Sequence, residues 1–230
     1  MHVRILARKL RETGRDYALR NLKDNIIHLE LKPGSMVSEN ELAAQMGLSR
    51  TPVREALMEL SKVRLVDVYP QRGSAVALID YDLVEEARFM RSVMECAVVE
   101  LVCRMAAPED MLALEENIAL QERCLKSGML ERLWTLDNTF HRELFRIARK
   151  TQTYDMVSSF TVHFDRVRNM SLAAVKDTKI VNDHRLIVQA IERHDEAGAK
   201  ALMAKHLERY KIDQAALLAG YPMDYFKQAQ

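Results

Sequence analysis

The fold of the first third of this chain is decided by one stretch, residues 38–57: Ser38-Glu39-Asn40-Glu41-Leu42-Ala43-Ala44-Gln45-Met46-Gly47-Leu48-Ser49-Arg50-Thr51-Pro52-Val53-Arg54-Glu55-Ala56-Leu57. Ser38 followed three residues later by Glu41 is a capping box, whose hydroxyl and carboxylate satisfy amide protons that a helix start leaves unpaired. Gly47 ends this helix, and Ser49 can cap a second helix with one apolar face. A helix, a short turn with glycine and a second helix together predict a helix-turn-helix.

The segments on either side extend this motif to a winged helix. Before it, residues 19–29 place leucines and an isoleucine at helical spacing and stop at Lys32-Pro33-Gly34, which predicts a helix ended by a turn. After it, residues 65–69 and 74–78 flank Pro70-Gln71-Arg72-Gly73, which predicts two strands joined by a tight loop. We therefore expect an N-terminal winged helix-turn-helix domain over residues 1–79.

The remainder of the chain has the composition of long helices. Between residues 81 and 219 its prolines and glycines are Pro108, Gly128 and Gly198. Helical periodicity predicts six segments, near residues 82–106, 108–127, 129–149, 154–175, 179–194 and 196–218. No alternating strand pattern interrupts them, so the fold class is mainly α, and residues 80–230 should form an all-α helical bundle with cavities between facing helices.

The charge of the chain is divided unevenly. Its 230 residues hold 34 Lys and Arg against 33 Asp and Glu, and this net charge of +1 does not by itself indicate nucleic-acid binding. Residues 1–79, however, hold 13 basic and 9 acidic side chains (+4), whereas residues 80–230 hold 21 and 24 (−3). The basic surplus belongs to the expected winged helix.

The apolar residues and cysteines indicate the compartment. No run of about 18 apolar residues is free of charges, and the basic N-terminus is not followed by the apolar core of a signal peptide. The three cysteines (Cys96, Cys103 and Cys124) form no C-x-x-C motif, which favours buried thiols over a disulfide or zinc framework. We expect a cytoplasmic protein without a membrane partner.

Candidate DNA-binding residues lie in the second helix of the motif and in the loop between the strands. Arg50 stands at the helix start and Arg54 one turn later, where an arginine can bond guanine O6 and N7. The hydroxyls of Ser49 and Thr51 suit phosphates, and Arg72-Gly73 at the hairpin tip can enter the minor groove. Spacing alone leaves open that both helical arginines form a solvated face.

Several separated blocks resemble one family in the right order. Pro33-Gly34, Ser38 to Ala43, Leu48 to Leu57 and Pro70 to Gly73 are similar to the winged-helix domain of GntR-family bacterial transcription regulators. This resemblance, over roughly residues 15–79, implies that Arg50 and Arg54 read bases. It also implies that Ser49 and Thr51 hold phosphate and that Arg72 and Gly73 form the wing tip. The chain departs from the pattern at Asn40, where an arginine is common, and at Arg64, which replaces the usual glycine.

Three histidines in the helical part are distinguished by their context. Asp137 and His141 are four residues apart, on one helical face, and His184 and His206 lie in two other predicted helices. Three imidazoles and a carboxylate can surround a divalent ion, and this mixed set suits Zn²⁺, Ni²⁺, Mn²⁺ or Fe²⁺ more than Ca²⁺. Composition alone leaves open that each is a surface or hydrogen-bonded core histidine.

The same residues resemble the FCD effector domain of the FadR-type branch of these regulators, over roughly residues 80–219. The match consists of the Asp137/His141 pair, His184 43 residues later, His206 22 residues further, and Arg91 to Glu95 on the first helix. It implies that the aspartate and the three histidines are metal ligands, with water or an effector carboxylate completing the shell. Six helices point to the VanR-like subgroup.

Two further details accompany this resemblance. Arg91 is the candidate to grip an anionic effector, because a guanidinium bonds a carboxylate bidentately, and an intrahelical pair with Glu95 is the alternative. The usual Gly-Asn after the third helix is absent from Arg149-Lys150-Thr151-Gln152-Thr153.

These observations predict a ligand-responsive transcription regulator and not an enzyme. We expect a homodimer that binds a double-stranded, inverted-repeat operator and is released from it by a small organic acid bound beside a divalent transition metal. Repression is the commoner outcome in the family. The alternatives are a metal-dependent helical-bundle enzyme and a pure metal-sensing regulator.

Overall fold

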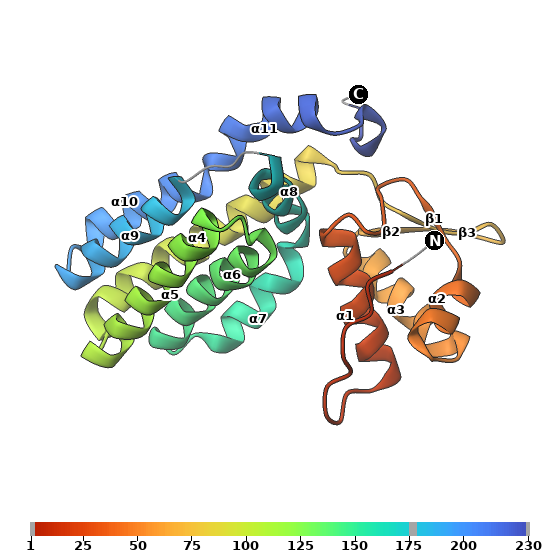
Figure 1. Cartoon of the computed structure of the whole chain (residues 1–230), viewed down its shortest axis with the longest axis horizontal. Coiled ribbons are helices and arrows are strands. Elements are labelled where there is room, and N and C mark those ends of the chain that lie inside the picture. Colours follow the sequence, from red (N-terminus) through yellow and green to blue (C-terminus); the bar gives the residue numbers. More distant parts are fainter. Residues whose placement is uncertain (1–2, 175–178, 229–230) are drawn as a thin grey trace. The chain divides into compact units, whose positions relative to one another are not determined.

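The computed structural model describes residues 3–174 and 179–228 (Figure 1). Its contacts divide the chain into two compact units. The first consists of Met1–Val84, Val162–Val167 and Leu218–Gln230, and the second of Glu85–Thr161 and Arg168–Leu217. None of the described helices has the length and apolar character that crossing a membrane requires.

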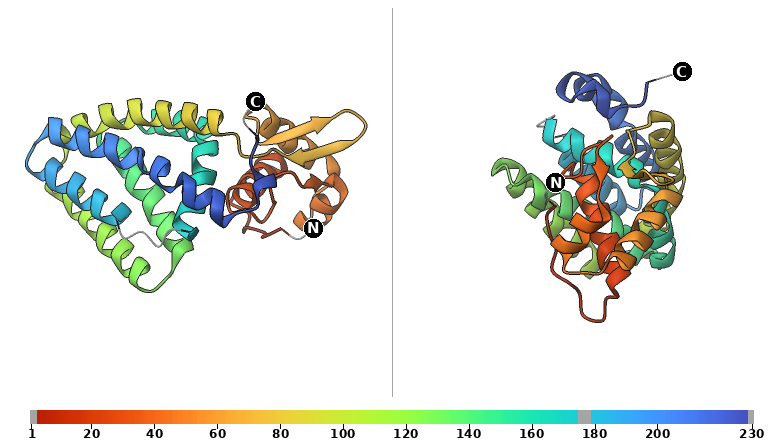
Figure 2. Two further views of the ribbon diagram at one scale, coloured as in Figure 1. Left: turned by 90° about the horizontal axis from the view of Figure 1, so that it is seen from above. Right: turned by 90° about the vertical axis from the view of Figure 1, so that its right-hand side faces the viewer.

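The first unit contains the winged helix. Its helices are α1 (Gly14–Ile27), α2 (Glu39–Met46) and α3 (Arg50–Lys62), and its strands are β1 (Met36–Val37), β2 (Val66–Tyr69) and β3 (Gly73–Val76). The strands form an antiparallel sheet in the order β1-β3-β2, and the β2–β3 hairpin extends away from the helices as the wing (Figure 2). The sequence predicted both hairpin strands and missed β1, since two residues are too few to show an alternating pattern.

Local chemistry sets the start and end of α2. The Ser38 hydroxyl accepts a hydrogen bond from the Glu41 amide at 3.4 Å, as the capping box predicted. Gly47 ends the helix with a φ of 64°, a left-handed conformation that glycine adopts without strain from a Cβ. The core beneath these helices includes Leu22, Leu42 and Leu57, all nearly inaccessible to solvent. Each such side chain stabilises the fold by about 1.5–3 kcal/mol.

The helices after the wing are more numerous than predicted. They are α4 (Tyr81–Met105), α5 (Pro108–Lys126), α6 (Leu130–Ile147), α7 (Thr151–Phe160), α8 (Val162–Ala174), α9 (Lys179–Glu192), α10 (Glu196–Leu207), α11 (Arg209–Gly220) and the short 3-10 helix η1 (Met223–Tyr225). The prediction of six helices was wrong, because the chain turns at Thr161 and again at Glu208. Neither turn contains the proline or glycine by which a break is recognised, and residue 175, the predicted end of the fourth helix, lies outside the described residues.

The second unit is an all-α bundle whose core carries polar groups. In it, α5 packs against α6 and α9, and α9 packs against α10. The buried face of α6 includes Phe140, Leu144 and Phe145 but also Asp137 and His141. The three cysteines are buried free thiols, as expected. A carboxylate and an imidazole inside this core require partners, and the facing helices supply them.

Candidate nucleic-acid interface and candidate metal centre

The two arginines predicted to read bases lie on the solvent-exposed face of α3. Arg50 is the first residue of the helix and Arg54 lies one turn later, and Thr51 is exposed beside them. Val53 and Leu57 on the opposite face are buried in the core of the unit. The sequence thus packs one face of α3 in the core and leaves the other exposed to solvent.

Two hollows run along this exposed face. One, of about 560 Å³, lies between α3 and the wing and is lined in part by Arg50, Arg54, Arg72 and Gly73. The other, of about 830 Å³, is lined in part by Arg50, Thr51 and Arg54. The fold therefore gathers five of the six predicted DNA-binding residues along one side of the winged helix.

Ser49, the sixth, is the exposed N-cap residue of α3 and is absent from the lining of both hollows. The expectation that its side chain caps the helix was wrong, since the hydroxyl makes no hydrogen bond to the helix amides. At the wing, Gly73 has a φ of 100°, at which any side chain would be strained. This backbone conformation explains why a glycine stands at the wing tip.

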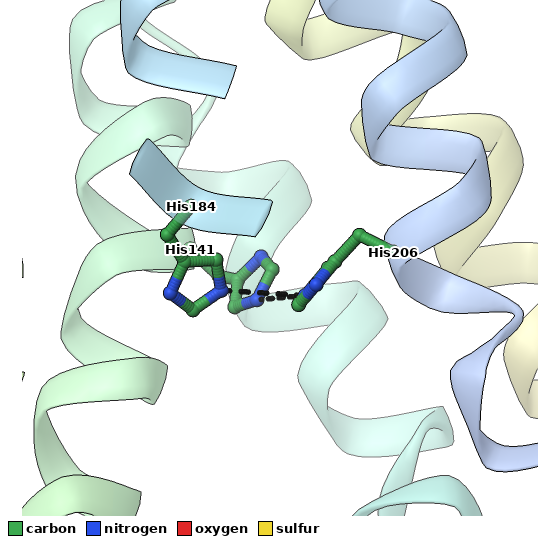
Figure 3. Close-up of side chains that lie close together, drawn as sticks. All are labelled: His141, His184 and His206. Carbon is green, nitrogen blue, oxygen red and sulfur yellow. Dashed lines mark hydrogen bonds between the residues drawn. The ribbon is translucent and has the colours of Figure 1, made fainter. Parts of the chain in front are cut away.

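The three histidines converge from three helices of the second unit. Figure 3 shows the imidazoles of His141 on α6, His184 on α9 and His206 on α10 turned toward one another. The Nε2 atom of His206 lies 3.3 Å from that of His184 and 3.4 Å from that of His141. All three side chains are buried. Asp137, the fourth predicted ligand, has Oδ1 3.6 Å from Nε2 of His184.

These separations fit a metal ion. With metal–nitrogen bonds of 2.0–2.1 Å, two nitrogens of a tetrahedral set lie about 3.3 Å apart. Asp137 Oδ2 is buried and accepts no hydrogen bond from the described residues. The oxygen lies 3.2 Å from Arg168 Nη1 without a hydrogen bond, so a cation between the imidazoles and this carboxylate would give it a direct ligand contact.

Each imidazole also has an oxygen beside its Nδ1 atom. His141 Nδ1 faces Glu95 Oε2 at 2.5 Å, and His184 Nδ1 faces Gln121 Oε1 at 2.9 Å. His206 Nδ1 lies 3.5 Å from Asp183 Oδ2. For His141 and His184, an acceptor at Nδ1 holds the proton there and leaves the Nε2 lone pair for a metal, as the outer partners of metal-bound histidines do. Nδ1 of His206 makes no hydrogen bond to the described residues. Glu95 lies on α4, Gln121 on α5 and Asp183 on α9.

Arginines balance the carboxylates of this site. Arg168 Nη1 lies 3.2 Å from Asp137 Oδ2, and its guanidinium lies 4.4 Å from the ring centroid of Trp134. Arg91 donates from Nε to Glu95, which is the intrahelical pair left open by the sequence. Arg209 donates from Nη2 to Asp183 Oδ1 at 2.7 Å. The sequence indicated neither Arg168 nor Arg209, because no motif marks them and both act through contacts between helices.

The pKa shifts of the site favour neutral histidines and an ionised aspartate, which is the protonation state that metal binding needs. Burial lowers the pKa of His141 and His184 well below the ordinary value, so both imidazoles are neutral and have a lone pair. Burial alone would raise the pKa of Asp137, but Arg168 and the neighbouring charges hold that pKa below its usual range. A carboxylate kept ionised among neutral imidazoles is a donor set for a divalent transition metal.

Two family models match successive parts of the chain. The family model of the bacterial regulatory proteins of the gntR family matches residues 16–76, and that of the FCD domain matches residues 86–209. The first match covers the winged helix, and the second covers Asp137 and all three histidines.

The relatives are transcription regulators. The chain is 36% identical over 213 residues to an uncharacterised helix-turn-helix regulator in an unstable DNA locus of Streptomyces ambofaciens, covering 92% of this chain and 89% of the relative. It is 32% identical over 190 residues to the transcriptional repressor RspR of Escherichia coli, covering 82% and 83%. The E. coli McbR/YncC structure shares the fold, with a TM-score of 0.76, 22% identity and coverage of 91% of this chain and 99% of that one.

Proposed function

Because the chain belongs to the GntR family of transcription regulators and carries an FCD domain, we propose that it is an operator-binding regulator whose affinity for DNA responds to a small carboxylate. The winged helix binds the operator, with Arg50 and Arg54 in the major groove and Arg72 and Gly73 at the adjacent minor groove. Ser49 and Thr51 contact phosphates. The placement of these residues along one exposed side of the unit supports this assignment.

In the helical unit, Asp137, His141, His184 and His206 hold a divalent transition metal. The observation that carries this half of the proposal is the approach of the three Nε2 atoms to one another inside the core. When bound, such an ion offers open coordination positions to oxygen ligands. The donor set accommodates Zn²⁺, Ni²⁺, Mn²⁺ or Fe²⁺.

The charges around the histidines favour an anionic effector. Three carboxylates (Glu95, Asp137 and Asp183) contact the imidazoles, and three guanidiniums (Arg91, Arg168 and Arg209) pair with them, so the charges cancel. A divalent cation adds two positive charges in a buried place, where uncompensated charge is costly. A small carboxylate bound to the ion offsets one of these two charges, and Arg91 and Arg168 are the cations that can orient it.

Regulation of this kind requires a dimer in which the two winged helices can take two different spacings. A two-fold symmetric pair of α3 helices matches an inverted-repeat operator, as in other helix-turn-helix proteins. Effector binding shifts the population toward a spacing of the winged helices that no longer fits the half-sites. Repression is the sign of regulation we propose, as in the name of the E. coli relative RspR.

The DNA-binding half is tested with duplexes selected from a random pool by the purified protein. Arg50→Ala should weaken binding of the selected duplex by about 1–3 kcal/mol and relax one base position, because a bidentate contact to guanine is lost. Unchanged binding by this variant would refute the assignment of α3 as the reading helix.

The metal half is tested by elemental analysis. Wild-type protein should carry a divalent transition metal, and the double variant His184→Ala/His206→Ala should lose it. Retention at the wild-type stoichiometry would refute the site. Titrating metal ions and organic acids separately against DNA binding then identifies the signal, since a response to the ion alone would make the protein a metal sensor.

A further inference from the structure

An acidic side chain lines the surface at which we place the DNA. Glu39 takes part in both hollows that Arg50 and Arg54 line, on the face of the winged helix that carries the predicted phosphate contacts. A carboxylate in this position repels the phosphates that the neighbouring arginines attract. Glu39 therefore weakens non-specific DNA binding, and attraction to the phosphates cannot explain why an acidic residue stands here.

The structure shows what Glu39 contacts. Its Oε2 atom accepts a hydrogen bond from Nη2 of Arg50 at 3.1 Å. Glu39 is the first residue of α2 and Arg50 is the first residue of α3, so this ion pair joins the starts of the two helices of the motif. The Glu39 side chain is 28% exposed and that of Arg50 is 67% exposed. The carboxylate is thus the more buried member of the pair, and the guanidinium is the more exposed one.

Stability does not account for this pair. An ion pair between exposed side chains contributes about 0–1 kcal/mol, and part of that is spent on ordering the two side chains. The contact does, however, restrict the directions in which the guanidinium of Arg50 can point. Restricting an arginine before it meets DNA reduces the side-chain entropy that binding would otherwise cost.

We propose that Glu39 is a specificity-determining positioning residue, which holds the guanidinium of Arg50 in the plane of one guanine and away from the phosphates. Nη2 carries two N–H groups, of which one is donated to Glu39. The other, together with those of Nη1, stays available for guanine O6 and N7. The inference rests on the proposed function, because it assumes that Arg50 reads a base.

Three substitutions in the full-length protein separate positioning from charge. Glu39→Ala removes both the carboxylate and the acceptor, whereas Glu39→Gln removes the charge but keeps an oxygen that can accept from Arg50. Glu59→Ala is the matched control, since Glu59 lines one of the same hollows and pairs with Arg15 and Lys62. Circular dichroism establishes that each variant is folded. Each protein then selects duplexes from a random pool, and anisotropy measures its affinity for the wild-type consensus and for single base-pair changes.

The expected result is a difference between the two Glu39 variants. The base pair read by Arg50 is identified as the position at which the Arg50→Ala variant loses the base preference of the wild-type protein. Wild type, Glu39→Gln and Glu59→Ala should all prefer guanine there, whereas Glu39→Ala should lose roughly tenfold of the discrimination against other bases. All three variants should bind unrelated duplexes more tightly than wild type, because each removes one negative charge facing the phosphates.

Two outcomes would overturn the inference alone. One is a Glu39→Ala variant that keeps the full wild-type preference at that base pair. The other is an equal loss in Glu39→Ala and Glu39→Gln, because charge and not the hydrogen bond would then explain the effect. If wild-type protein enriches no sequence from the pool, the proposed function itself fails, and the inference falls with it.

Discussion

Two arginines that follow helices take the left-handed backbone conformation that glycine adopts at least cost. Arg64 follows α3 and Arg149 follows α6, and both have a φ of 56°. After α6, the amide of Arg149 donates to Arg146 O at 3.0 Å and that of Lys150 to Phe145 O at 2.7 Å. These bonds form a Schellman motif, which satisfies carbonyls at the helix end. The family resemblance implied a glycine at the position of Arg64 and a Gly-Asn pair within residues 149–153, so the left-handed backbone is present at both places without the glycine.

We expect Arg149→Gly to stabilise the protein. A residue with a Cβ in the left-handed region lowers the free energy of unfolding by roughly 1–2 kcal/mol. Replacing it by glycine removes this strain, but the greater freedom of glycine in the unfolded chain offsets part of the stabilisation. A net gain of about 1 kcal/mol raises the melting temperature by roughly 2–4 °C. Arg149→Ala, which removes the same charge but keeps a Cβ, is the control. An equal rise in both variants would attribute the effect to charge instead of backbone strain.

The outer partners of the histidines lead to a second prediction. Gln121 is fully buried, and its amide nitrogen donates to Asn117 at 2.6 Å, which turns its oxygen toward His184. Gln121→Met keeps the volume but removes the acceptor, so metal affinity should fall about 10–100-fold with every ligand in place. Competition with a chelator measures this affinity. Gln189→Met on the exposed face of α9 is the control and should bind metal like wild type.

At the scale of helices and strands, the sequence predicted the features that depend on local chemistry. Ser38, Gly47 and the wing loop are each recognisable within a few residues, and each is found where it was expected. The breaks after α7 and α10 were missed, because these turns contain no glycine or proline. The metal ligands could be proposed from the family resemblance of the histidine pattern, but Arg168 and Gln121 could not. Their roles arise from packing between helices that are distant in sequence.

The segment after α11 makes a further contact between distant parts of the chain. Phe226 forms a parallel bridge with Ile79, just after the wing, and its ring stacks on Tyr81 at 5.8 Å. The Ile79 amide donates to Tyr225 O at 2.8 Å, and the Lys227 amide donates to Ile79 O at 2.9 Å. Phe226 is buried, so this C-terminal strap (residues 221–227) fixes the backbone that leads from β3 into α4.

Removing the aromatic ring of the strap should release this backbone locally. In Phe226→Ala, the Ile79 amide should exchange with solvent roughly a hundredfold faster, since truncating a buried phenylalanine costs about 3 kcal/mol. The amide of Val76, which bonds Ser35 O at 2.9 Å, is the internal reference and should not change. Met223→Ala, at an exposed side chain of η1, is the control. Unchanged exchange at Ile79 would show that the strap does not restrain this segment.

For the whole molecule, the net charge of +1 is the sum of a basic excess in residues 1–79 and an acidic excess in residues 80–230. The basic excess belongs to the part of the chain that carries α3 and the wing, and the acidic excess to the part that carries the histidines. Among the described residues, the three histidines that could hold a metal all lie in the second unit. Trp134, the single tryptophan of the chain, lies in that unit with the guanidinium of Arg168 over its ring, and its fluorescence reports on the region around the ligands.

Metal ions should therefore raise the temperature at which Trp134 fluorescence reports unfolding. A ligand that binds only the folded state at a hundred times its dissociation constant stabilises it by about 2.7 kcal/mol, which is roughly 5–10 °C for a unit of this size. Zn²⁺, Ni²⁺ and Mn²⁺ are compared in turn, and the ion that fits the site should give the largest shift. His184→Ala/His206→Ala should show none of it, because the remaining Asp137 and His141 cannot surround an ion. Equal shifts in wild type and double variant would place the stabilising ion elsewhere in the protein.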